Sequence, residues 1–188
     1  MVFRILKRRK KSIQGLDDYE IVDGKPWWVV ALEGKEFPSD PDEMYEEIEK
    51  ITKIGLRLVD DYDYRRKVFE EIVKRGYDPE KLLEELERRE ESWLKGKGKR
   101  GSLYEDLLRT VIRYFIELEE IREEEEAFKR QSVESEEEKE ELEEFIKQRK
   151  FINETGFQAL IVGIINTASN FIPLIEQLRS LKRMGMME

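Results

Sequence analysis

The strongest constraint on this chain is a run of 21 residues without a charged side chain, Thr155–Ile175 (TGFQALIVGIINTASNFIPLI). Across the whole sequence, 42% of the residues are charged. An apolar surface this dense has to be covered by the chain's own fold, by a partner, or by a lipid bilayer. The nature of that cover decides what kind of protein this is.

The uncharged run has the periodicity of a helix. Thr155 and Gln158 form a capping-box pattern, which predicts that a separate helix begins there. Pro173 is expected to kink this helix in its last third. One face carries apolar residues at alternating spacings of four and three, which is a heptad seam. The seam consists of Phe157, Ile161, Ile164, Ala168, Phe171, Ile175 and Leu178.

Three explanations of the run stay open. A central core helix is the first, because short apolar runs in globular domains are mostly core. In the second, the seam packs against another copy or another protein. The third is a membrane span, since about 20 residues cross a bilayer core. Asn166 lies in the middle and disfavours lipid, whereas Ala159, Gly163 and Thr167 offer a small-residue face for close helix approach.

Charge is segregated along the chain. The net charge is −9, and Glu117–Glu144 alone holds 15 acids and 4 bases, or −11, which leaves +2 for the rest. Basic clusters of this kind contact nucleic-acid phosphates, an anionic leaflet or an acidic protein surface, and they also occur as solvated tails. The candidate contacts are Arg4, Lys7, Arg8, Arg9, Lys10 and Lys11 in an arm, and Lys97, Lys99 and Arg100 in a loop.

The chain contains no cysteine and no histidine. This excludes Ser-His-Asp and Cys-His catalysis, thiolate or imidazole zinc sites, and disulfides. We therefore predict no cofactor, no metal and no enzymatic activity. The basic start is not followed by an apolar signal region, so we expect a cytoplasmic location. Abundant Glu, Lys and Arg with scarce Asn and Gln are typical of a thermophile.

One short motif offers an enzymatic alternative. Asp23 is followed ten residues later by Glu33-Gly34-Lys35, at the end of an apolar stretch. This pattern resembles the PD-(D/E)xK nuclease family over 13 residues. The resemblance implies that Asp23 and Glu33 bind Mg²⁺ and that Lys35 stabilises the attacking water or the phosphate.

The fold is predicted to be mainly α-helical, a bundle or coiled-coil-like hairpin with a small N-terminal β-hairpin. Two strands are expected around the turn at Asp23-Gly24, at 19–22 and 27–32, with Trp27 and Trp28 on opposite faces of the second. We divide the chain into an arm (1–12), a hairpin-plus-helices part (13–95), a basic glycine-rich linker (96–102) and a charged helical hairpin with the apolar helix (103–188).

Helix-start patterns occur at three further places. Asp40 and Asp78 each precede a proline, which predicts N-caps, and Ser102 with Glu105 predicts a capping box. The charged rod that follows is either broken near 132–135 into two antiparallel helices or forms one helix of roughly 75 Å.

From these observations we expect a non-enzymatic structural or assembly protein. It would associate with itself, or with a protein partner, through its C-terminal helices, as scaffold- or coat-like proteins of mobile elements do. A nucleic-acid-associated protein that uses the basic arm and loop is the first alternative. A tail-anchored or peripheral membrane protein is the second.

Overall fold

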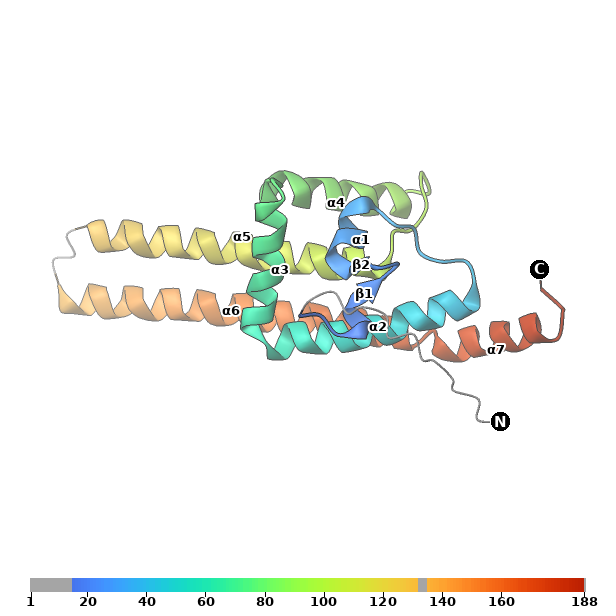
Figure 1. The fold of residues 1–188 in the computed structure, drawn as a ribbon. Coiled ribbons are helices and arrows are strands. Elements are labelled where there is room, and N and C mark those ends of the chain that lie inside the picture. Colours follow the sequence, from blue (N-terminus) through green and yellow to red (C-terminus); the bar gives the residue numbers. More distant parts are fainter. Residues whose placement is uncertain (1–14, 132–134, 188) are drawn as a thin grey trace, which may run out of the picture.

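The computed structural model describes residues 15–131 and 135–187, and it confirms a mainly α-helical protein with a small N-terminal β-hairpin (Figure 1). The elements are η1 (Asp18–Glu20), β1 (Ile21–Val22), β2 (Lys25–Pro26), α1 (Trp27–Glu33), α2 (Pro41–Asp60), α3 (Tyr62–Lys74), α4 (Pro79–Leu94), α5 (Leu103–Arg130), α6 (Glu136–Ser169) and α7 (Ile172–Arg183).

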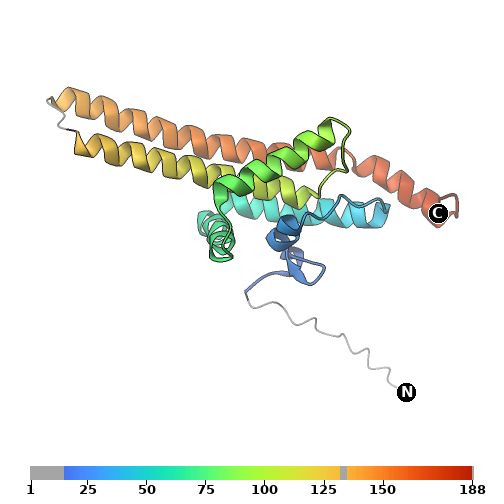
Figure 2. The ribbon, with the colours of Figure 1, turned by 90° about the horizontal axis from the view of Figure 1, so that it is seen from above.

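Helices α5 and α6 form a long antiparallel hairpin, and its far end extends beyond the rest of the molecule (Figures 1 and 2). The remaining elements gather at the other end of this hairpin. Helix α2 packs along the C-terminal half of α6 and along α7, while α1, α3 and α4 pack on α5. One cluster of buried apolar residues joins elements from both sides of the 96–102 loop.

The β-hairpin is shorter than predicted. Asp23 and Gly24 have φ angles of 52° and 77°, as the predicted turn requires, and Val22 pairs with Lys25. The second predicted strand is wrong, because residues 27–33 form helix α1. The prediction that Trp27 and Trp28 lie on opposite faces of a strand is therefore also wrong, and both side chains are buried.

The physical reason is that this segment is a continuous apolar run without periodicity. Such a run fits a buried strand or a buried helix equally well, and its neighbours decide between them. Here the indole Nε1 of Trp27 donates a hydrogen bond of 3.0 Å to the hydroxyl of Tyr64 on α3, and α1 packs on α5.

The three further predicted helix starts are confirmed, since α2, α4 and α5 begin directly after Asp40, Asp78 and Ser102. The Asp40 carboxylate accepts hydrogen bonds from the backbone N–H groups of residues 42 and 43, and Asp78 caps α4 in the same way. The predicted Ser102 capping box is wrong, because its buried hydroxyl makes no cap. Instead, Glu47 of α2 accepts a hydrogen bond of 2.5 Å from the N–H of Leu103. A carboxylate distant in sequence therefore caps α5.

The predicted break in the charged rod is confirmed. Helix α5 ends at Arg130, α6 begins at Glu136, and the Ser135 hydroxyl caps α6. The predicted helix start at Thr155 is wrong, since α6 continues through it to Ser169. The Thr155 hydroxyl donates to the carbonyl of Phe151 one turn earlier, as threonines inside helices do. In place of the predicted kink the helix is interrupted, because α6 ends at Ser169 and α7 begins at Ile172 with Pro173 in its first turn.

Candidate interaction surface

Helix α6 is anchored by a buried arginine at the turn between α2 and α3. The Arg65 side chain is only 1% exposed and forms an ion pair of 2.8 Å with Glu154 of α6. It also donates to the carbonyl of Leu58 at 2.9 Å, and its guanidinium lies 3.9 Å from the ring centre of Phe157. These contacts fix the position of α6 along its own axis and its rotation about that axis, relative to α2 and α3.

A glycine allows α2 and α6 to approach closely. A Cβ atom added at Gly55 of α2 would lie 2.8 Å from Cδ1 of Ile165 and 3.2 Å from Cγ2 of Ile161. Real Cβ atoms hardly ever approach that closely. The missing side chain of Gly55 therefore sets the distance between the two helices and turns Ile161 and Ile165 inward.

This anchoring places most of the predicted seam inside the molecule. Phe157, Ile161, Ala168 and Ile175 are buried in the core, and Ile164 and Leu178 are partly buried. Of the seven seam residues, Phe171 alone is exposed, at 55%. The seam is thus mainly the stripe by which α6 and α7 pack on their own chain.

The opposite side of α6 forms a second stripe with the same spacing, which we call the outer stripe. It consists of Ile152, Gly156, Ala159, Gly163, Asn166 and Asn170, separated by four and three residues in alternation, and all six are exposed. Ile152 is 63% exposed, and Leu160 beside the stripe is 47% exposed. The spacing is that of a helix-packing face, but within the described residues it has no cover.

In the part of the chain that the structure describes, the two glycines of the outer stripe pack against no other element. A Cβ atom added at Gly156 or Gly163 would meet no atom within 4 Å. A glycine inside a helix costs roughly 1 kcal/mol relative to alanine. Unlike Gly55, these residues therefore destabilise α6 without an intramolecular packing benefit, whereas a second helix on this face would gain close approach.

An apolar groove of about 750 Å³ runs beside the outer stripe. Trp93 and Leu103 lie on the side of α4 and α5, while Leu160, Phe171 and Leu174 lie on the side of α6 and α7. Leu174 is 51% exposed. Because Leu160 and Gly163 line the groove as well, the groove and the outer stripe form one continuous surface.

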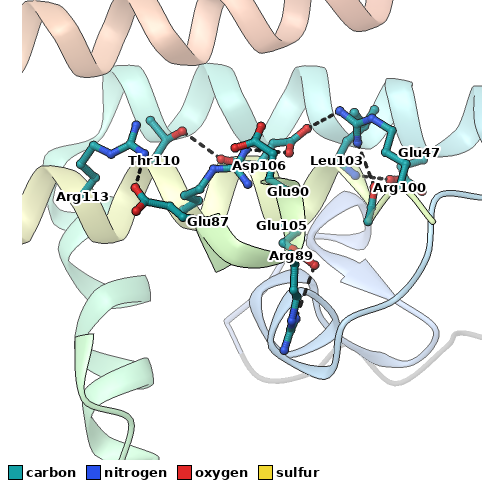
Figure 3. A network of polar contacts seen from close by, with 12 residues as sticks. Glu47, Glu87, Arg89, Glu90, Arg100, Leu103, Glu105, Asp106, Thr110 and Arg113 are labelled. Carbon is teal, nitrogen blue, oxygen red and sulfur yellow. Dashed lines mark hydrogen bonds and ion pairs between the residues drawn. The ribbon is translucent and has the colours of Figure 1, made fainter. Parts of the chain in front are cut away.

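Charged groups at the edge of the groove neutralise one another (Figure 3). Asp106 accepts hydrogen bonds from Arg100 at 2.7 Å and from Arg109 at 3.0 Å, and Arg109 also contacts Glu90 at 2.9 Å. Glu47 lies close by, and burial raises the pKa of its carboxyl to about 7, although the hydrogen bond from Leu103 opposes this shift. The groove therefore presents apolar walls rather than free charge.

The raised pKa of Glu47 predicts a pH-dependent stability. Its folded pKa of about 7 lies above the ordinary value of 4.5, so the folded state binds the proton more tightly and stability falls as the pH rises between these values. We expect Glu47→Gln, which keeps an acceptor for Leu103, to remove this loss. Urea unfolding at pH values on either side of the window measures it. Glu49→Gln on the same helix is the control, and an unchanged pH dependence in Glu47→Gln would contradict the assignment.

The predicted cationic contacts are only partly described. In the loop, Lys99 pairs with Glu36 at 2.9 Å and Arg100 with Asp106 at 2.7 Å, while Lys97 makes no ion pair with any described residue. Two of the three predicted loop cations thus pair with carboxylates of their own chain. The arm residues Arg4, Lys7, Arg8, Arg9, Lys10 and Lys11 lie outside the described residues, and their contacts stay a prediction.

The residues of the nuclease-like motif lie near the β-hairpin. Lys35 pairs with Asp23 at 2.7 Å, whereas Glu33 at the end of α1 pairs with Lys25 at 2.8 Å. Each carboxylate thus has a lysine as its partner. Among residues 15–131 and 135–187, no group of three or more Asp and Glu side chains could hold a metal ion.

Sequence reasoning found the small-residue face but not its role. The sequence predicts Ala159, Gly163 and Thr167 as a face for close helix approach, and the structure places all three on the exposed side of α6. The heptad seam is the stronger pattern in the sequence because its residues are larger.

Searches of protein-family models, curated proteins and solved structures give no match for this chain.

Proposed function

We propose that this is a non-enzymatic assembly protein, scaffold- or coat-like in class, whose copies associate through the outer stripe and the adjoining groove. The observation that carries the proposal is an exposed helix face without charge in a chain that is 42% charged. Solvated surfaces are rich in charged residues, whereas the centres of interfaces are depleted of them. The outer stripe has the composition of an interface centre.

The first half of α6 provides an internal comparison. Residues 136–144 of the same helix are exposed or partly exposed and include seven glutamates. Exposure alone therefore does not remove charge from this helix. Charge disappears where α6 runs beside the groove, and there large apolar residues such as Leu160 and Phe171 are exposed.

A bilayer is the competing cover for this face. Within Glu136–Arg183 the helix is long and apolar enough to span a membrane, and only 22% of its most apolar window is buried. However, a span would have to pull α6 away from α2, which would open the close contact at Gly55 and break the ion pair that the buried Arg65 forms with Glu154. Losing that packing and leaving Arg65 unpaired is costly, which favours a protein partner.

Two adjacent residues on α6 provide the test. Leu160 is exposed beside the outer stripe, and Ile161 is fully buried. We expect the wild type to be larger than its monomer mass of 22.6 kDa in light scattering. Leu160→Glu would put a charge into the interface while leaving the core intact, and it should weaken association at least tenfold, or about 1.4 kcal/mol. The helical circular-dichroism spectrum should stay unchanged.

Ile161→Glu is the matched control, because it puts a carboxylate into the core and should unfold the chain instead. A wild-type protein that stays monomeric at every concentration would overturn the proposal. Flotation of the wild type with liposomes, together with a monomeric mass in buffer, would identify the bilayer as the cover.

A further inference from the structure

We infer that two copies pair through α6 in antiparallel orientation, with a two-fold axis near Gly163. This inference rests on the proposed self-association and adds the orientation and register of the partner. An isologous two-fold pair is the commonest form of a homo-oligomer, and it needs one surface that is complementary to itself. The surface along α6 and α7 meets this requirement in charge, in side-chain size and in shape.

Charge along α6 and α7 favours the antiparallel orientation. Residues 136–144 of α6 include seven glutamates and one lysine, whereas α7 ends with Arg179, Lys182 and Arg183. Arg179 and Lys182 already pair with Asp40 and Asp42 at the start of α2, so this basic end is partly neutralised within its own chain. Helix α7 continues roughly along the direction of α6 in both views (Figures 1 and 2). An antiparallel pair keeps the two acidic halves apart and brings the C-terminal end of α7 of each copy toward the acidic half of the other. A parallel pair would instead place the acidic halves side by side, where like charges repel.

The order of large and small side chains along α6 and α7 favours a two-fold axis near Gly163. If Gly163 faces its own copy, Gly156 faces Asn170 and Ile152 faces Leu174, because each pair is equally distant from Gly163 along the chain. Small residues then meet at the centre, where the helix axes can approach most closely. Large exposed residues meet at both ends and close the contact from water.

The groove offers a site for apolar side chains of the second copy. Phe171 and Leu174 line it and are exposed, at 55% and 51%. In the antiparallel register, the partner's Ile152 lies beside Leu174, and the aromatic side chain of the partner's Phe151 lies next to the partner's Ile152. The groove thus receives the most exposed apolar side chains of α6, which are Phe151 at 67% and Ile152 at 63%.

The chain contains no cysteine, so single cysteines report the register without background. Gly163→Cys should form a disulfide-linked dimer under mild oxidation. A mixture of Ile152→Cys with a tagged Leu174→Cys chain should give the mixed disulfide-linked dimer. Either variant alone should give little disulfide-linked dimer. Gln131→Cys, exposed at the far end of the hairpin, is the control for random collision.

The possible results separate the inference from the proposed function. Cross-linking of Ile152→Cys with itself, without the mixed product, would show a parallel pair and overturn the inference while self-association stands. A different outcome is that every variant cross-links no more than the Gln131→Cys control while light scattering gives a mass above that of the monomer. This result would show that another surface mediates association. A monomer by light scattering would overturn both.

Discussion

Replacing Arg65 with alanine should destabilise the protein by about 3–5 kcal/mol, because this side chain is only 1% exposed and its loss leaves a cavity in the core as well as a partly exposed Glu154 without its partner. Arg65 also donates to two backbone carbonyls at the end of α2 and lies against the rings of Tyr114 and Phe157. The change therefore removes an ion pair, two hydrogen bonds and cation–π contacts together. Typical domains have only about 5–15 kcal/mol of stability.

The neighbouring arginine is a matched control. Arg66 is exposed, and its ion pairs with described residues are those with Asp63 and Glu70 on the surface of α3, so Arg66→Ala should cost less than about 1 kcal/mol. Thermal unfolding followed by circular dichroism compares the two variants, and a difference of roughly 10 °C is expected. Equal melting temperatures would mean that Arg65 does not anchor α6.

Enlarging Gly55 should have the next largest effect. The Cβ atom of Gly55→Val would already overlap Ile165, and its two methyl groups would push α2 away from α6. Overpacking of this kind costs about 1–3 kcal/mol. Because Ile161 and Ile165 face Gly55, the displacement should also loosen the helix that carries the outer stripe. Urea unfolding gives the change in the free energy of unfolding.

The control for this variant lies on the other side of α6. An added Cβ at Gly163 meets no atom within 4 Å, so Gly163→Val should leave the free energy of unfolding nearly unchanged in the monomeric Leu160→Glu background. In the wild-type background it should weaken association. If Gly55→Val and Gly163→Val were equally destabilising in the monomer, the close contact between α2 and α6 at Gly55 would not be the cause.

Local sequence signals predicted the helix boundaries that depend on near neighbours. Asp40 and Asp78 cap their helices through N–H groups two and three residues later, and Ser135 does the same for α6. A cap of this kind is nearly independent of the rest of the fold. At Ser102 the same rule failed because α5 begins inside the molecule, where Glu47 reaches the helix N-terminus from α2.

Signals without a local cause were misread. Thr155 has the residue type of a helix start, but no glycine or proline interrupts the chain just before it, so the hydrogen-bond ladder of α6 continues. The apolar run that begins at Trp27 has no period that separates a strand from a helix. Packing against α5 and the hydrogen bond to Tyr64 accompany the helical form.

By itself, the sequence determined that α6 carries an uncharged segment and that apolar or small residues occupy every side of this segment. It also determined that acidic and basic charge lie at opposite ends of the C-terminal region. These are properties of composition and spacing. Only the tertiary structure decided which side of the helix is core. Gly55 admits Ile161 and Ile165, and Arg65 fixes Glu154, so the larger stripe turns inward. The stripe of Gly156 and Gly163 consequently faces outward, because a helix can turn only one side toward α2.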